Sequence, residues 1–152
     1  MSDSHSAPIR LLDGIARLQG RLRGAFAEAR QGSGLNDMEH TVLAAVTEAR
    51  AAPTVPQIGR ALGHPRQVIQ RAASSLAEKG LIELADNPDH KRASLLIATS
   101  AGKAVQGEAN RKAEAISARL LGLLDGARLS AVIDQIEAIR AVLDADARKA
   151  KP

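Results

Sequence analysis

The sequence has very few aromatic residues and no cysteine. One Phe and no Tyr or Trp occur among its 152 residues, so a folded core must be aliphatic, and a hydrophobic fraction of 45% is enough to build one. The absence of cysteine excludes disulfides, thiolate metal sites and a cysteine-based redox switch. Any binding or regulation must therefore use other side chains.

Long apolar runs are absent as well. No stretch approaches the roughly 20 residues that span a bilayer, and the N-terminal sequence MSDSHSAPIRLLDG has no basic stretch followed by an apolar one, as a secretory signal would. We therefore expect a soluble protein of the cytoplasm. The length suits one ordinary domain, alone or with helical extensions. A net charge of +4 allows a polyanionic partner without requiring one.

Apolar residues recur at the three-and-four spacing of an amphipathic helix near both ends of the chain. The N-terminal stripe lies within residues 8–30 and comprises Leu11, Ile15, Leu18, Leu22 and Phe26. Beyond residue 104, two further stripes are separated by the sequence DGAR at residues 125–128, and the tail from residue 144 is expected to fray. The region between is too small to cover all these stripes, so they predict a homodimer interface.

The middle of the chain predicts three helices in close succession. The first begins with Asn36 as N-cap and Glu39 three residues later, the pattern of a capping box. The sequence TVPQIGRALG (residues 54–63) predicts a short helix that Gly63 ends, and PRQVIQRAASSLAEKG (residues 65–80) predicts a longer one. A short helix, a tight turn and a longer helix in this order indicate a helix-turn-helix.

Two short β-capable runs follow, LIEL (residues 81–84) and ASLLIA (residues 93–98), around the turn-rich sequence ADNPDHKR. Lys91 and Arg92 lie beside the tip of this hairpin, and Thr99 is placed to cap the next helix. A charged hairpin directly after a helix-turn-helix is a wing. The expected fold is therefore mainly α with a small β-wing.

The helix of residues 65–80 has two contrasting faces. At 100° per residue, one face carries Ile69, Ala72, Ala73 and Leu76 and must point to the core. The opposite face has side chains that can contact DNA. Arginine pairs bidentately with guanine, glutamine pairs with adenine, and serine suits bases or phosphates. The candidates on this face are Gln67, Gln70, Arg71, Ser74 and Ser75.

Three further candidates would contact the DNA backbone or a groove edge. Arg66, at the helix start, suits a phosphate beside the positive helix N-terminus. Lys91 and Arg92 suit a narrow minor groove, where the negative potential is enhanced. The alternatives are a helix face that is only solvated and a hairpin tip that only aids solubility.

The span from Thr54 to Lys103 resembles the multiple-antibiotic-resistance regulator (MarR) family of winged-helix repressors. The resemblance rests on a helix ending in ALG, a next helix ending in LAEKGLI, the wing pattern NP-x-x-KR-A and the T-x-x-G entry to the following helix. It covers about residues 35–103 in detail and only the order of helices elsewhere.

This resemblance implies a dimeric repressor of double-stranded DNA. Its terminal helices would interlock with those of a second copy, the second helix of the motif would enter the major groove, and the wing would enter the minor groove. A small molecule bound between the dimerisation and DNA-binding regions would release the DNA. The expected regions are an N-terminal dimerisation helix (1–34), a DNA-binding region (35–103) and C-terminal dimerisation helices with a tail (104–152).

The wing departs from the family pattern. The family usually has an acidic residue two positions before the wing arginine, where this chain has His90 with Asp89 beside it. Either Asp89 takes that role, or the wing is looser and its contact with DNA is sensitive to pH. A second expectation concerns the effector: with Phe26 as the one aromatic residue, a cavity has little to stack an aromatic ligand with, so a phenolic inducer is less expected.

Other functions are less well supported by the sequence. The four histidines, at positions 5, 40, 64 and 90, show no i, i+4 pairing with another metal ligand, so a metal-responsive sensor is only an alternative. Ser74 and Ser75 lack a nearby base, and no phosphate-binding glycine motif is present, so we expect no enzyme and no cofactor. The remaining alternative is a winged-helix module whose wing binds an acidic protein.

Overall fold

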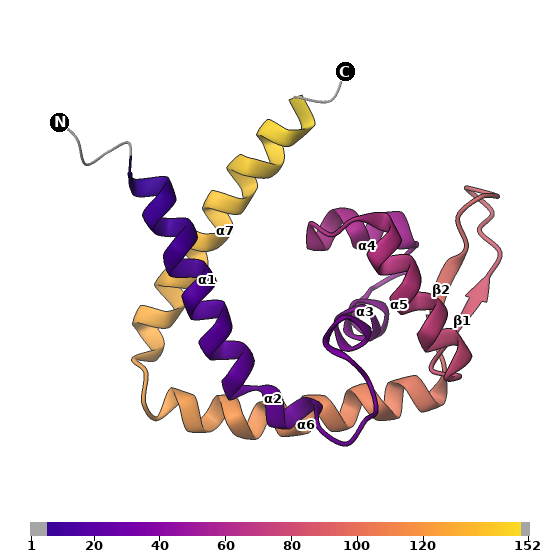
Figure 1. Cartoon of the computed structure of the whole chain (residues 1–152), viewed down its shortest axis with the longest axis horizontal. Coiled ribbons are helices and arrows are strands. Elements are labelled where there is room, and N and C mark those ends of the chain that lie inside the picture. Colours follow the sequence, from indigo (N-terminus) through magenta and orange to yellow (C-terminus); the bar gives the residue numbers. More distant parts are fainter. Residues whose placement is uncertain (1–5, 150–152) are drawn as a thin grey trace. The chain divides into compact units, whose positions relative to one another are not determined.

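The computed structural model describes residues 6–149, which are mostly helical with one two-stranded antiparallel sheet (Figure 1). This confirms the expected winged-helix class. Contacts divide the chain into two compact units, one up to Ala113 and one from Glu114 onward. The elements are α1 (Ala7–Ala25), α2 (Ala27–Arg30), α3 (Asp37–Glu48), α4 (Val55–Leu62), α5 (Arg66–Glu78), β1 (Ile82–Ala85), β2 (Leu95–Ala98), α6 (Ser100–Leu121) and α7 (Gly126–Lys149).

The helix ends follow local chemistry that the sequence shows. The Asn36 side chain accepts from the backbone N–H of Met38 and Glu39, and the Glu39 carboxylate accepts from the Asn36 N–H, which confirms the predicted capping box of α3. Gly63 ends α4 with a φ of +67°, a conformation that favours glycine. Thr99 caps α6, since its Oγ1 accepts from the Gly102 N–H at 3.1 Å.

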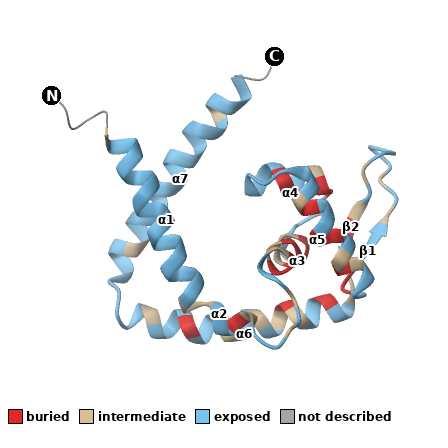
Figure 2. Ribbon diagram, in the orientation of Figure 1, coloured by how far each residue is buried: buried red, intermediate tan, exposed pale blue. Residues whose placement is uncertain are grey.

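The core lies where α3, α5 and the sheet meet (Figure 2). The inward residues predicted for α5 are all buried, so that prediction is confirmed. They pack with aliphatic side chains from α3, α4 and the strands, of which Leu43 and Leu96 are among the most completely buried. An all-aliphatic core follows directly from the scarcity of aromatic residues.

The wing (residues 82–98) is tied to the segment before α4. Its strands pair in antiparallel register, with Ile82 opposite Ala98. Leu95 forms an isolated antiparallel β-bridge with Thr54, and the Leu96 N–H donates to the Pro53 carbonyl at 2.8 Å. The segment before α4 therefore lies along the β2 edge of the sheet. In the wing loop, the Asn87 amide donates to the Ala93 carbonyl at 2.9 Å and its Oδ1 accepts from the Asp89 N–H.

Two details differ from the sequence-based expectation. The first helix is interrupted: α1 stops at Ala25, Phe26 takes backbone angles outside the helical region, and α2 resumes for one turn. The fraying expected from Asp144 is wrong as far as Lys149, because α7 continues to that residue. Among residues 6–149, every helix is either too short or too polar to span a bilayer.

The helices near both ends have large apolar side chains exposed along their length. Neither α1, in the first unit, nor α7, in the second, buries a single residue (Figure 2). The exposed set on α1 comprises Ile9, Leu11, Leu12, Ile15, Leu18 and Leu22, and that on α7 comprises Val132, Ile133, Ile136, Ile139, Val142 and Leu143. The amphipathic stripes predicted from the sequence therefore form, and they lack cover within their own units.

Candidate functional site

A tight turn sets α5 against α4. The His64 N–H donates to the Gly59 carbonyl at 3.0 Å, and a Cβ on Gly59 would lie 3.0 Å from the His64 carbonyl oxygen. Glycine at this position therefore lets the two helices approach closely, as a helix-turn-helix requires. Pro65 precedes α5 with extended backbone angles, so the helix begins at Arg66.

Of the six α5 residues predicted to contact DNA, the four on the polar face other than Ser75, and Arg66 at the helix start, are exposed. Their side chains offer two guanidinium groups, two amides and a hydroxyl to the solvent, and they are Arg66, Gln67, Gln70, Arg71 and Ser74. Only one long contact, 3.5 Å from Gln70 Nε2 to Ser74 Oγ, links any two of these side chains. The donors and acceptors on this face are thus available to an external partner.

Ser75 lies apart from this set. Its side chain is half-buried, and its Oγ donates to the Glu39 carboxylate at 2.5 Å. The hydroxyl therefore holds α5 to α3 instead of facing the solvent.

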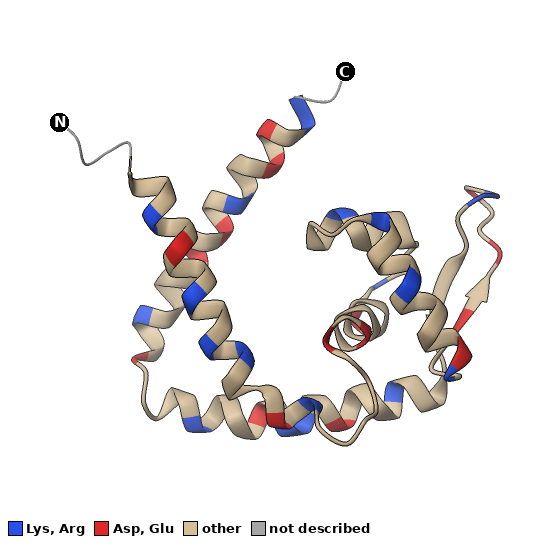
Figure 3. Cartoon of the chain, in the orientation of Figure 1, with Lys and Arg blue, Asp and Glu red and all other residues tan. Residues whose placement is uncertain are grey.

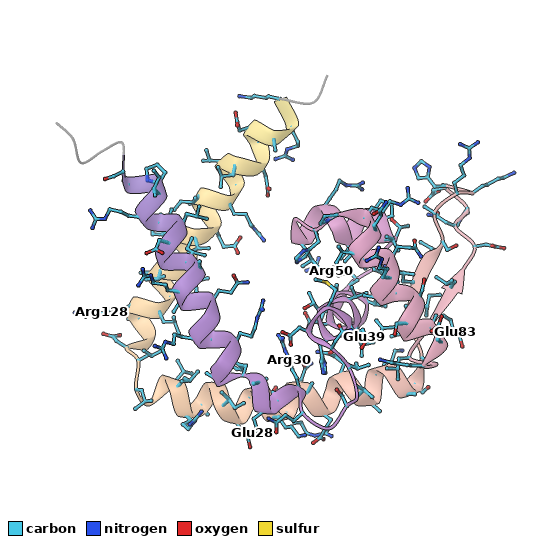
Figure 4. The ribbon with its side chains drawn as sticks, in the orientation of Figure 1. Glu28, Arg30, Glu39, Arg50, Glu83 and Arg128 are labelled. Carbon is cyan, nitrogen blue, oxygen red and sulfur yellow. The ribbon has the colours of Figure 1, made fainter. Side chains whose placement is uncertain are left out.

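Glu39 is the centre of a buried polar cluster that fastens α5 to α3 (Figure 4). Although it is only 3% exposed, the Glu39 side chain accepts from Lys79 Nζ, at 2.8 Å from each carboxylate oxygen. Burial alone would raise the pKa of Glu39, but hydrogen bonds from Lys79, Ser75 and the Asn36 N–H lower it from 4.5 to about 2. Lys79 also donates to the Gly34 carbonyl at 3.2 Å, so the loop before α3 joins the cluster.

The wing and α5 contribute to one basic surface. Lys and Arg residues occur in α4, in α5 and at the wing tip (Figure 3). Arg66 of α5 and Arg92 of the wing line the same surface hollow, of about 620 Å³, whereas Lys91 lines a separate one on the wing loop. Arg60 of α4 lines the hollow as well. Sequence reasoning missed it, although a basic residue on the polar side of the short helix was a usable signal.

Within residues 6–149 the wing arginine, Arg92, has no acidic partner. No ion pair joins Arg92 to Asp89 or to any other carboxylate in the described part of the chain, and Asp89, His90 and Arg92 are all exposed. Of the two alternatives for the wing, the structure therefore does not show Asp89 in the supporting role.

A second site lies within the first unit, in a cavity of about 380 Å³ among α2, α3 and α6. Its lining residues include five alanines, whose side chains are small and apolar. Phe26, the single aromatic residue of the chain, lines it too, which the sequence did not indicate. The polar lining residues include Arg30, His40 and Gln106.

His40 is held in the cavity wall by the loop after α2. Its Nε2 lies 2.8 Å from Ser33 Oγ and 3.2 Å from the Arg30 carbonyl oxygen. Burial lowers the pKa of His40, which favours the neutral form of the ring. His40 directly follows Glu39, and the two neighbours on α3 therefore connect the cavity wall with the cluster that fastens α5.

No group of three His, Asp or Glu side chains within residues 6–149 is arranged to hold a metal ion. His5, one of the four histidines considered for a metal sensor, lies outside the described residues. The other three are at separate places: in α3, in the turn before α5 and in the wing loop.

Comparison with known proteins finds a matching family model, sequence relatives and solved structures with a similar fold. A model described as the MarR family matches residues 33–93. Uncharacterized protein Rv2011c from Mycobacterium tuberculosis is 36% identical over 139 residues, covering 90% of this chain and 94% of the relative. CouR from Rhodococcus jostii RHA1, solved bound to p-coumaroyl-CoA, is similar at a TM-score of 0.74 and 22% identity, covering 91% and 95% of the two chains. A mutant MarR from E. coli, solved with operator DNA, has a TM-score of 0.75 and 19% identity, covering 91% and 99%.

Proposed function

The chain belongs to the MarR family of transcriptional regulators, and from this we propose that it is a homodimeric repressor that binds operator DNA and releases it when a small molecule binds. The observation that best supports this is the exposed polar face of α5, next to a hollow lined by arginines from α4, α5 and the wing. A protein-interaction module would not need glutamine and arginine along that helix. A regulator of this kind works in the cytoplasm, where its DNA is.

On this proposal α5 enters the major groove. Gln67 and Arg71 lie one turn apart on the exposed face and have the donor and acceptor groups that distinguish adenine and guanine. Gln70 and Ser74 flank them. Ser75 does not contact DNA in this proposal. Its hydroxyl donates to the Glu39 carboxylate and so holds α5 to α3.

The arginines around the hollow bind phosphates and the minor groove. Arg66, at the N-terminus of α5, and Arg60, on α4, meet the backbone, where the charge of a guanidinium adds affinity without sequence preference. Lys91 and Arg92 extend from the wing into the adjacent minor groove. A mutant MarR from E. coli, one of the structurally similar proteins, was crystallised with operator DNA.

The exposed apolar stripes of α1 and α7 form the dimer interface. Apolar patches of this extent mark sites of association, and neither helix buries a residue within its own unit. Regions 1–34 and 104–152 are thus the dimerisation regions, and residues 35–103 bind DNA. Two copies would contact two half-sites of a pseudo-palindrome about one helical turn apart.

The cavity among α2, α3 and α6 is the proposed effector site. Its volume and mainly apolar wall are those of a small-molecule pocket. His40 lines this cavity, and the next residue along α3, Glu39, accepts a hydrogen bond from Ser75 of α5. A ligand that moves the start of α3 would therefore also move the DNA-binding helix α5. CouR, one of the solved relatives, was crystallised with p-coumaroyl-CoA.

Substitutions on α5 should distinguish residues that recognise the base sequence from residues that bind the DNA backbone through charge alone. After an operator has been selected from random duplexes with the wild-type protein, Gln67→Ala and Arg71→Ala should each weaken operator binding by about 1–3 kcal/mol, because base contacts are lost. Binding to a scrambled duplex should change far less. Arg66→Ala should weaken both duplexes about equally and lower the salt slope by about one. Fluorescence anisotropy at two salt concentrations measures all of these.

Arg71→Lys is the matched control for this experiment. It keeps the positive charge but loses the two-pronged geometry of the guanidinium, so discrimination should fall while the salt slope stays that of the wild type. If Gln67→Ala, Arg71→Ala and Arg71→Lys all discriminate as the wild type does, α5 does not recognise sequence.

The wild-type protein should sediment as a dimer at micromolar concentration. Leu18→Asp places a charge in the exposed stripe of α1 and should shift the protein towards monomer. Arg17→Ala alters the adjacent residue, which pairs with Asp13 at the surface, and should leave the dimer unchanged. A folded wild-type monomer, or the same behaviour in both variants, would count against the proposed interface.

A further inference from the structure

The wing loop brings a histidine to the surface hollow that three arginines line. The residues that line this hollow of about 620 Å³ include Arg60 of α4, Arg66 of α5, and His90 and Arg92 of the wing loop. None of these arginines forms an ion pair with a carboxylate in the described part of the chain. Three positive charges without an acidic partner therefore share one hollow with a residue that can carry a fourth.

The backbone of the wing loop holds His90 in place while its ring stays free. The His90 N–H donates to the Asn87 carbonyl at 3.3 Å, and the His90 carbonyl accepts from the Ala93 N–H at 3.0 Å. The imidazole is exposed and, within residues 6–149, takes part in no hydrogen bond or ion pair. Both ring nitrogens are therefore available to an external partner.

Asp89 is the acidic residue among those that line the hollow. Its carboxylate has no ion-pair partner among the described residues, so it would repel a DNA phosphate that enters the hollow. A protonated His90, the next residue along the chain, would counter this repulsion. The other charged residues of the loop tip, Asp86 and Lys91, have opposite charges and line a separate hollow.

Proton binding by His90 should depend on whether DNA occupies the hollow. Histidine is the side chain whose charge ordinarily changes between pH 5 and pH 8. Without DNA, the nearby guanidinium groups oppose a further positive charge on the ring, whereas a phosphate in the hollow favours it. A protonated ring can donate a hydrogen bond from both nitrogens, but a neutral ring can donate from only one and adds no charge.

We propose that His90 is a further contact with the DNA backbone, and that each bound copy of the chain takes up one proton at this residue when it binds DNA. The inference rests on the proposed DNA-binding function of the hollow. Because the complex holds more protons than the free protein does, DNA affinity rises as the pH falls from 8 to 6. This dependence on pH does not require a ligand in the cavity among α2, α3 and α6.

Salt titrations at pH 6 and pH 8 test the inference in the full chain. Fluorescence anisotropy with the selected operator and with a scrambled duplex gives the affinity and its salt slope at each pH. For the wild type, we expect the slope to be steeper at pH 6 by about 0.9 for each bound copy, because one more phosphate is neutralised. The affinity should be about five-fold higher at pH 6 for each bound copy, the size expected when a phosphate shifts the proton equilibrium of one imidazole by about one pH unit.

Two variants of His90 separate its charge from any other role of the residue. His90→Gln should show the wild-type slope of pH 8 at both pH values, whereas His90→Arg should show the wild-type slope of pH 6 at both. His64→Gln is the matched control, since His64 is also exposed, in the turn before α5, but does not line the hollow. It should keep the pH dependence of the wild type.

The inference is overturned if the wild-type slope is the same at both pH values, if the pH dependence persists in His90→Gln, or if His64→Gln removes it. Thermal unfolding of each protein at both pH values shows that the compared proteins are folded. A wild-type protein that binds neither duplex at low salt would instead contradict the proposed DNA-binding function, so the two failures are distinguishable.

Discussion

Replacing Gly102 by alanine should lower the free energy of unfolding by about 3 kcal/mol, the upper range for overpacking a tightly packed site. Gly102 lies in the first turn of α6, and a Cβ there would lie 2.0 Å from the Leu81 carbonyl oxygen and 3.3 Å from Leu43 Cδ1. The first of these neighbours is backbone, so no change of side-chain rotamer relieves the clash. The same carbonyl accepts from the Thr99 N–H, which leads into α6, so moving it also disturbs the start of the helix.

Gly107→Ala in the same helix is the control. A Cβ at Gly107 would meet only the flexible end of Arg111, at 4.0 Å. Alanine there should stabilise the protein by about 1 kcal/mol through its higher helix propensity. Urea unfolding of both variants and the wild type, at one protein concentration, measures the difference. Equal stabilities of the two variants would show that α6 does not dock against Leu81 as described.

The close contact at Gly102 illustrates what sequence reasoning cannot reach. The capping box at Asn36, the glycine end of α4 and the inward face of α5 were predictable, because each depends on residues within a few positions of one another. The approach of Gly102 to Leu81 depends on how a helix docks against a distant turn. A glycine in the first turn of a predicted helix does not indicate that the helix packs closely against a distant backbone segment.

The same distinction holds for the two sites. The exposed face of α5 followed from helical periodicity, and only Ser75, at its margin, turned out to be engaged elsewhere. Its partner Glu39 lies 36 residues away and was expected only as a capping residue. The cavity brings together Phe26 and Gln106 from segments far apart in the sequence, so no local pattern could have placed the single aromatic residue there.

Glu39 should make the protein sensitive to acid. Its pKa is lowered from 4.5 to about 2 in the folded state, so the folded protein is stabilised by the charged form above pH 4.5 and loses that contribution as the pH falls from 4.5 towards 2. The difference corresponds to about 3 kcal/mol. Glu39→Gln should remove this part of the pH dependence and should cost about 2–3 kcal/mol at pH 7, where an amide replaces a carboxylate bound to Lys79 and Ser75.

Urea unfolding of the wild type and Glu39→Gln at pH 7 and pH 3 measures this contribution, because other carboxylates titrate equally in both proteins and cancel in the difference. Glu108→Gln is the matched control: Arg111 lowers the pKa of Glu108, but that pair is exposed and solvent screens it. It should therefore leave the pH dependence unchanged. The stability gap between wild type and Glu39→Gln should narrow at pH 3, and a gap that stays constant would mean that folding does not lower the pKa of Glu39. Since the cluster holds the end of α5, Glu39→Gln should also weaken operator binding at pH 7 more than Glu108→Gln does.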